Sequence, residues 1–188
     1  MTVMPREERY SSVAILFHWS IAALVIANLA IGLLHENVLD GVGWAIPLHK
    51  SFGVTVLVLT LGRIGWRLTH RPPPLPASTP RWEKGAAHGV HWVLYALMLA
   101  MPLTGWMLSS GGRRYPISWF GLFDVPFLPV SRATGSIAHD AHGLLGWLML
   151  ALVALHAAAA LRHHLVLRDR VLARMAPALD RTAQRDRV

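Results

Sequence analysis

The chain has 188 residues, of which 54% are hydrophobic and 15% are charged, and its mean hydropathy is +0.41. This balance excludes an ordinary soluble domain and is typical of a protein that crosses a membrane several times. The absence of cysteine excludes disulfides, thiolate-bound iron–sulfur clusters and haem attached through a C-x-x-C-H motif. Redox chemistry therefore requires cofactors held by histidine or by non-covalent contacts.

Four stretches are long and apolar enough to cross a hydrocarbon core of roughly 30 Å, which takes about 20 helical residues. They are residues 13–34, 48–68, 88–108 and 142–161. The second is the least apolar, but Lys50, Arg63 and Arg67 lie near its ends, where long basic side chains reach the interface. The first lacks the short apolar core and the cleavage site of a signal peptide. The sequence therefore predicts an all-α membrane protein, a bundle of four transmembrane helices.

An even number of spans places both termini on one side of the membrane. Of the 18 Lys and Arg residues, only four fall on the other side: Lys50, Arg113, Arg114 and Arg132. The positive-inside rule therefore predicts that both termini are cytoplasmic. This topology, together with attraction to anionic headgroups of the lipid bilayer, accounts for the formal net charge of +8. We expect no nucleic acid as a partner.

Two of the loops have distinctive compositions. The connector 71–87 is rich in proline, so we expect it to be extended, semi-rigid and cytoplasmic. The long loop 109–141 between the third and fourth helices is too interrupted by glycine and proline to be a fifth span. It is also too aromatic for a plain solvated loop, and we expect it to form a lid on the periplasmic surface. Its residues Trp119, Phe120 and Phe123 either cap a cofactor or anchor the loop in the interface.

Histidines at membrane depth are costly and by default mark a functional site. His142 and His156 are fourteen residues apart, which is about 21 Å along an α-helix and nearly the same helix face. They therefore lie in different leaflets. Given the predicted topology, His18 lies at the depth of His156, and His49 lies at the depth of His142. The sequence predicts two histidine pairs.

A glycine accompanies each histidine of the periplasmic pair. Gly53 follows His49 by four residues, and Gly146 follows His142 by four residues. Residues spaced in this way share a helix face, so the glycine leaves flat space beside the imidazole. Haem, with one imidazole on each side of the porphyrin, fits that space. We therefore predict that the four histidines are axial ligands of two haems and that the two glycines pack against haem.

Other interpretations of the histidines remain open. Each one is alternatively a hydrogen-bonded packing residue. His88 and His91 open the third span near the cytoplasmic face and compete with His18 as the partner of His156. A transporter of divalent metal ions is disfavoured, because no Asp or Glu lies in the spans and the histidines are too far apart for one small ion.

The chain resembles the bacterial cytochrome b561 proteins over about residues 8–175. The motifs are HW at 18–19, LHKSFG at 48–53, LYALMLAMPLTGW at 94–106, SSGG at 109–112, WFGLFDVP at 119–126, HGLLGW at 142–147 and ALVALHAAAALRHH at 151–164. The resemblance implies a four-helix protein of the bacterial inner membrane with two haems b. Its ligand positions match the four histidines: His18, His49, His142 and His156. We therefore expect a cytochrome domain over 1–175 and a flexible basic tail over 176–188.

The family includes proteins that resemble superoxide:ubiquinone oxidoreductases, which implies electron transfer from periplasmic superoxide to ubiquinone. The cations Lys50, Arg113 and Arg114 would concentrate this anionic substrate above the periplasmic histidine pair. The alternative is that they bind haem propionates or lipid phosphates.

Candidate residues for the ubiquinone side are Arg162, His163 and His164. They follow the predicted haem ligand His156 by about two helical turns. Histidine delivers protons near neutral pH, so this cluster is a candidate ubiquinone site. The alternative is an interfacial cluster at a helix end. A different function also fits the sequence, namely a membrane-anchor subunit that relays electrons from a redox partner protein within a larger dehydrogenase or hydrogenase complex.

Overall fold

The computed structural model of the chain describes residues 9–35, 37–76, 79–111 and 115–179. Four long helices dominate the described part: α1 (Ser12–Leu34), α2 (Ala45–Thr69), α3 (Arg81–Ser110) and α4 (Arg132–Arg162). Each of them is long and apolar enough to cross a membrane. The prediction of four transmembrane helices is confirmed.

Two of the helices extend beyond the apolar stretches that predicted them. α3 begins at Arg81, inside the segment 71–87 that we expected to be an extended connector. α4 begins at Arg132, where the Ser131 side chain caps the helix by accepting a hydrogen bond from the Thr134 amide at 3.1 Å. Hydropathy detects only the part of a helix that lies in the hydrocarbon, so the polar first turns of both helices were missed.

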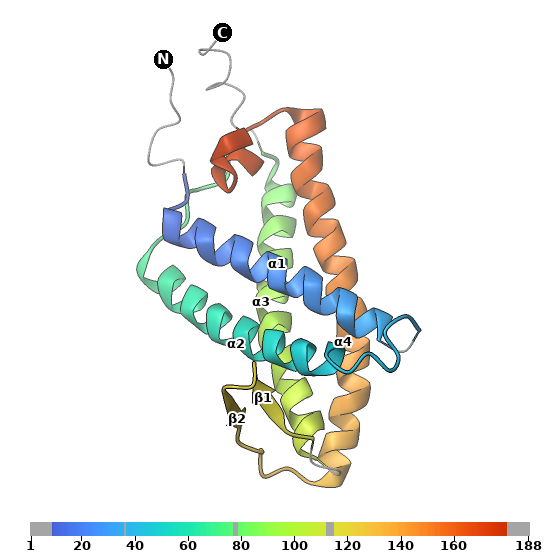
Figure 1. The fold of residues 1–188 in the computed structure, drawn as a ribbon. Helices are drawn as coiled ribbons and strands as arrows, with labels where there is room; N and C mark the ends of the chain where they lie inside the picture. Colours follow the sequence, from blue (N-terminus) through green and yellow to red (C-terminus); the bar gives the residue numbers. More distant parts are fainter. Residues whose placement is uncertain (1–8, 36, 77–78, 112–114, 180–188) are drawn as a thin grey trace.

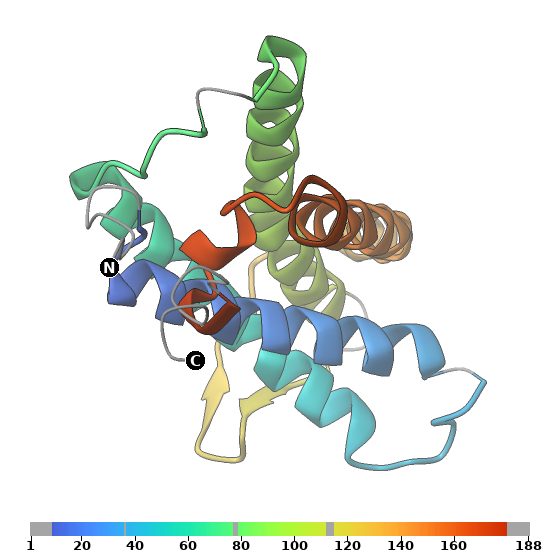
Figure 2. The same cartoon turned by 90° about the horizontal axis from the view of Figure 1, so that it is seen from above.

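The helices form two antiparallel pairs, α1 with α2 and α3 with α4 (Figure 1). In both views the first pair runs obliquely across the second (Figures 1 and 2). We call the end of the molecule at which α1 begins and α4 ends the termini end. The opposite end, at which α2 and α4 begin, is the hairpin end.

The hairpin end carries a small antiparallel sheet, which an all-α prediction did not include. Strand β1 (Ile117–Trp119) pairs with β2 (Phe123–Val125), and Ile117 lies opposite Val125. The turn places Phe120 and Gly121 at positive φ, 49° and 73°, a conformation that glycine adopts without steric cost. Strand β1 of the loop between α3 and α4 packs against α2.

Beyond α4 the chain turns back toward α1. A π-helical turn (His163–Leu167) is followed by two short 3₁₀ helices, Leu172–Arg174 and Pro177–Leu179. The Trp19 indole donates a hydrogen bond to the Met175 carbonyl at 2.8 Å, and the Arg174 guanidinium donates to the Pro74 carbonyl. These contacts hold the segment after α4 against α1 and against the segment that follows α2. The remainder of the predicted basic tail, 180–188, lies outside the described residues.

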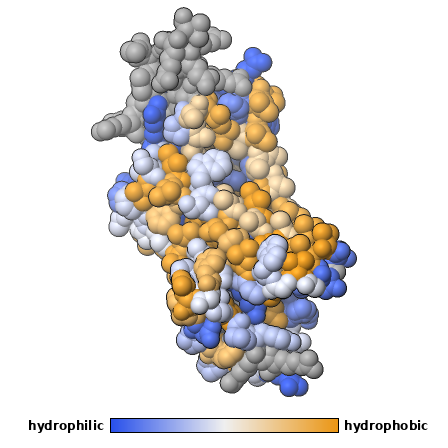
Figure 3. Space-filling model, in the orientation of Figure 1, coloured by the Kyte–Doolittle hydropathy of each residue, from blue (hydrophilic) through white to orange (hydrophobic). Residues whose placement is uncertain are grey.

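The buried core is small and lies midway along the helices. It is formed by apolar side chains from all four of them, Ile21, Val25, Val56, Tyr95, Leu97, Met98 and Met149. Many other large apolar side chains are exposed; Leu16 is 68% and Leu144 is 72% accessible. Figure 3 shows hydrophobic residues over much of the middle of the molecule, with hydrophilic residues more frequent toward its ends. Soluble monomers rarely expose such continuous apolar surface, so this belt is the lipid-facing surface of the protein.

Candidate functional site

The histidines of the hairpin end face each other across the helix pairs. The ring centroids of His49 on α2 and His142 on α4 lie 6.0 Å apart, and the rings are inclined by 78°. Nδ1 of His49 lies 3.2 Å from the Asn28 carbonyl oxygen. Because a carbonyl only accepts hydrogen bonds, this nitrogen carries the proton and Nε2 keeps its lone pair. The His49 ring is therefore held with its metal-binding nitrogen available.

His142 is held in a similar way by α3. Its Nδ1 lies 3.0 Å from the Thr104 hydroxyl, which also lies 2.9 Å from a backbone carbonyl one turn earlier in the same helix. The hydroxyl donates its proton to that carbonyl and accepts one from His142. Both rings of the pair therefore leave Nε2 free, which is the tautomer that a metal-ligating histidine requires.

The histidines of the termini end also form the predicted pair. The ring centroids of His18 on α1 and His156 on α4 lie 6.1 Å apart, almost the same separation as in the other pair. The predicted competitor His91 on α3 lies closer to His156, at 5.3 Å. His91 is exposed, however, whereas the other two rings are half-buried. The other predicted competitor, His88, is exposed and contacts the Lys84 carbonyl.

Arg63 distinguishes the termini-end pair from the other one. Its Nη2 lies 3.3 Å from Nδ1 of His18. A guanidinium only donates hydrogen bonds, so Nδ1 of His18 accepts here and Nε2 carries the proton. Iron at Nε2 would place the ring proton on Nδ1, and the guanidinium would turn away from that nitrogen. The Tyr95 ring, 5.3 Å from the guanidinium carbon, still keeps the positive charge beside the pair.

The glycines predicted to pack against haem have space beside them. A Cβ at Gly53 would lie 3.8 Å from the Asn28 side chain, and one at Gly146 would lie 3.8 Å from the Met101 methyl group. Both are ordinary contact distances. Neither position has an imidazole as its nearest neighbour, so their packing against haem stays a prediction.

Two other glycines lie directly against the hairpin-end rings. A Cβ at Gly32 would be 3.0 Å from Cε1 of His49, and one at Gly105 would be 3.2 Å from Cε1 of His142. Neither glycine was among those that the sequence predicted to pack against haem. Neither glycine is one helical turn from the histidine that it contacts, because each contact is made across helices. The spacing of residues along the sequence therefore could not predict these contacts.

The loop over the hairpin end is fixed to α2 just beyond His49. The buried Ser51 hydroxyl accepts a hydrogen bond from the Phe120 amide at 3.0 Å, and the Trp119 indole donates to Thr55 at 3.1 Å. Phe123 is 56% exposed. The aromatic segment therefore lies over the first turns of α2, as expected of a lid. Trp119 is turned inward and Phe123 outward.

Of the predicted substrate-approach cations, Lys50 lies on α2 and contacts that loop. Lys50 donates a hydrogen bond to the Pro116 carbonyl at 3.3 Å, and its amine lies 5.6 Å from the centroid of the Tyr115 ring. Lys50 thus contacts the lid at the hairpin end, which the sequence predicts to be periplasmic. Arg113 and Arg114 lie outside the described residues. The role of all three in substrate approach stays a prediction.

The predicted ubiquinone-side cluster at the end of α4 is paired with carboxylates. Arg162 forms a 2.9 Å ion pair with Glu83 of α3. His163 lies 3.4 Å from Glu83 and 2.5 Å from Asp169. The neighbouring His164 is half-buried. These contacts fasten the end of α4 to the start of α3, which is a structural role sufficient to explain the first two side chains.

Four lipid-facing helices with one pair of opposed imidazoles toward each end define a membrane protein of the cytochrome b type. Residues 9–178 match the family of prokaryotic cytochrome b561 proteins, and the chain belongs to that family. It is a multi-pass protein of the bacterial inner membrane that acts in electron transfer of the cytochrome b561 type, and membership implies that it binds haem b.

Curated relatives cover nearly the whole chain. Cytochrome b561 homolog 2 of Escherichia coli (strain K12) is 36% identical over 173 residues, 89% of this chain and 91% of the relative. The probable superoxide oxidase CybB of Yersinia pestis is 34% identical over 174 residues, 90% of this chain and 97% of the relative. Cytochrome b562 of Cereibacter sphaeroides is 36% identical over 179 residues, 92% of this chain and 98% of the relative.

Proposed function

We propose that the chain binds two haems b, one at each histidine pair, and transfers electrons from superoxide on the periplasmic side to ubiquinone. The observation that carries the proposal is the presence of two opposed imidazole pairs with nearly equal separations, 6.1 and 6.0 Å. The likeness to a probable superoxide oxidase supports the choice of electron donor. The termini end is cytoplasmic in this proposal, as the distribution of basic residues predicts.

The residues at both pairs fit haem b. Two neutral imidazoles are the donor set of a six-coordinate haem iron, and the apolar helices around them suit the porphyrin. The carbonyl of Asn28 and the hydroxyl of Thr104 orient the rings of His49 and His142, so that these ligands are held before the cofactor enters. Haem b supplies one-electron redox chemistry when it is bound. With one imidazole of the pair on each side, a haem held there would leave no position at which oxygen could bind.

The chain itself determines which reactants reach each end. At the hairpin end, Lys50 and the lid place a cation where a small anion such as superoxide would arrive. Between the two pairs lies the packed apolar core, which keeps water from the middle of the protein. The helices thus separate a periplasmic oxidation from a cytoplasmic-side reduction.

The test is a spectroscopic one on the purified chain. Oxidised and dithionite-reduced spectra with pyridine haemochrome quantification should give two haems per chain. Superoxide should reduce them, and ubiquinone should then reoxidise them. Two haems that do not respond to superoxide would instead indicate a relay subunit of a larger complex, and a chain without haem would contradict the proposal.

Ligand variants assign the haems to the pairs. His142→Ala and His18→Ala should each lose one of the two haems, because each removes one imidazole of a different pair. His91→Ala is the matched control and should keep both, although its ring lies near His156. Loss of a haem in His91→Ala, with retention in His18→Ala, would make His91 the ligand.

A further inference from the structure

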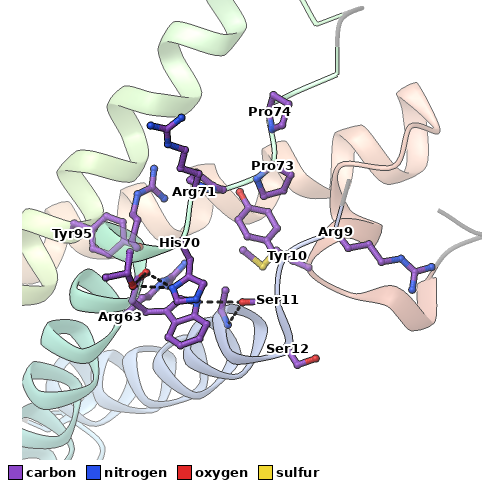
Figure 4. A pocket seen from close by; sticks show the side chains of 16 residues that line it. Arg9, Tyr10, Ser11, Ser12, Arg63, His70, Arg71, Pro73, Pro74 and Tyr95 are labelled. Atoms are coloured by element: carbon purple, nitrogen blue, oxygen red, sulfur yellow. Dashed lines mark hydrogen bonds between the residues drawn. The ribbon is translucent and has the colours of Figure 1, made fainter. Parts of the chain in front are cut away.

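A cavity of about 820 Å³ opens at the termini end, apart from the cluster at the end of α4. Its walls come from the start of α1, the end of α2, the proline segment that follows, and Tyr95 of α3 (Figure 4). Aromatic and polar side chains alternate around it, among them Tyr10, Ser11, Trp66 and His70. The cavity is large enough for a substituted ring of the size of a quinone head group.

The cavity is strongly basic. Among the described residues, its lining contains no Asp or Glu, and it includes four arginines: Arg9, Arg63, Arg67 and Arg71. Arg63 and Arg67 lie on successive turns of α2, with their guanidinium carbons 5.3 and 5.7 Å from the centroid of the Tyr95 ring. Neither of these two forms an ion pair with a carboxylate within the described part of the chain. Their charge is therefore available to a ligand with negative or partially negative oxygens.

Arg63 connects the cavity to the termini-end pair. The same guanidinium that lines the cavity lies 3.3 Å from Nδ1 of His18. A ligand in contact with Arg63 is thus separated from the His18 ring by a single side chain. By contrast, Arg162 forms an ion pair with Glu83 of α3, and His163 lies 3.4 Å from the same carboxylate; none of these three residues lines the cavity.

The cavity also contains groups that can hold a proton. Burial raises the pKa of the Tyr10 phenol, against the lowering effect of the nearby arginines, so the hydroxyl stays protonated at neutral pH. His70 is exposed and stacks on Trp66, with ring centroids 3.6 Å apart and an interplanar angle of 6°. Trp66 in turn donates to the Ser11 hydroxyl at 3.2 Å. Tyr10 thus lines the cavity, and His70 lines it at an exposed position.

We propose that this cavity, rather than the Arg162–His164 cluster, binds the head group of ubiquinone and is the place where it is reduced. The proposal rests on the proposed function and names its acceptor site. Overall, two superoxide ions are each oxidised to oxygen, and one quinone takes up the two electrons and two protons to form the quinol. Each added electron places negative charge on the quinone oxygens, which the Arg63 and Arg67 guanidinium groups stabilise. Tyr10 and His70 supply the protons.

The kinetic test uses the haem-loaded protein in lipid nanodiscs with a short-chain ubiquinone. Arg67→Gln and Tyr10→Phe should each raise the KM for quinone or slow haem reoxidation by about tenfold or more, as expected for the loss of one charge-assisted contact. Reduction of the haems by superoxide should be unchanged in both variants. Arg81→Gln is the matched control, because it removes an exposed arginine of the same end that does not line the cavity.

Two results of these kinetics would overturn the proposal. One is a tenfold effect of Arg162→Gln together with normal kinetics of Arg67→Gln. The other is loss of a co-purified anionic phospholipid from Arg67→Gln with unchanged quinone kinetics, which would make the cavity a headgroup site for lipid.

A binding experiment keeps the test independent of electron transfer. A photoreactive ubiquinone analogue should label the peptide that contains residues 9–12, and unlabelled ubiquinone should compete. Labelling confined to residues 162–167 would contradict the proposal even in a protein that does not respond to superoxide. Labelling of residues 9–12 in a chain that superoxide cannot reduce would support the quinone site and refute only the proposed donor.

Discussion

Nη2 of Arg63 lies 3.3 Å from Nδ1 of His18, whereas the equivalent nitrogen of His49 faces the carbonyl of Asn28 at 3.2 Å. The two histidine pairs therefore have opposite electrostatic surroundings. A fixed cation favours the state that has gained an electron, and a carbonyl that accepts from an axial imidazole strengthens that ligand and favours the oxidised state. We expect the haem at the termini end to have the higher midpoint potential, so that electrons move away from the hairpin end.

The substitution Arg63→Gln should lower the higher of the two midpoint potentials and leave the lower one in place. If the variant loses a factor of ten in the equilibrium constant between the two haems, the shift is about 59 mV for a one-electron couple. Spectroelectrochemical titration measures both potentials in one experiment. Arg63→Lys keeps the charge and should keep most of the gap. Unchanged potentials in Arg63→Gln would show that the guanidinium does not set the direction of transfer.

A bulky side chain at Gly32 should disturb the hairpin-end pair. Even a Cβ there would lie 3.0 Å from Cε1 of His49, so Gly32→Leu must displace the ring from its hydrogen bond with Asn28. We expect the haem content to fall from two per chain toward one. Gly65→Leu on α2 is the matched control, since nothing lies within 4 Å of its Cβ position. Equal haem content in the two variants would show that contact with Gly32 does not position His49.

The lid depends on one buried hydroxyl. Ser51 is 2% exposed and holds the Phe120 amide, so Ser51→Ala leaves that amide without its partner. Such a loss costs about 1–3 kcal/mol, which should appear as faster amide hydrogen exchange over 117–125 with little change in the helices. Ser136→Ala, at an exposed position of α4, should exchange like the wild type. Unaltered exchange in Ser51→Ala would mean that the hydrogen bond of Trp119 to Thr55 is enough to hold the lid.

The sequence was sufficient for the pairing of His18 with His156 and of His49 with His142, because depth in a membrane is a one-dimensional quantity. Helix direction alternates with each span, so position along the chain converts directly into depth. Contacts that depend on how the helices rotate and cross could not be predicted from position along the chain. The packing of Gly105 against His142 and the basic cavity at the termini end both arise from such crossings.

The polar ends of the helices were missed for a different reason. The first turns of α3 contain charged residues, including Glu83, and a hydropathy pattern treats them as loop. Arg162 was for the same reason considered without its partner. Once α3 is known to begin at Arg81, the ion pair between Arg162 and Glu83 becomes the simpler explanation of that arginine.

A close backbone contact between the end of α3 and the first turn of α4 permits one further prediction. A Cβ at Gly111 would lie 2.6 Å from the Cα of Gly135, a contact between two backbones that no rotamer change can relieve. Gly111→Ala should therefore separate the two helices at the hairpin end and destabilise the protein by about 1–3 kcal/mol, the usual cost of overpacking. Gly85→Ala, within α3, places a Cβ that would meet nothing within 4 Å and should instead be neutral or stabilising. Thermal unfolding in detergent distinguishes the two. A melting temperature for Gly111→Ala equal to that of Gly85→Ala would mean that α3 and α4 can move apart without loss, and that the position of His142 relative to His49 is set by α2 and the lid.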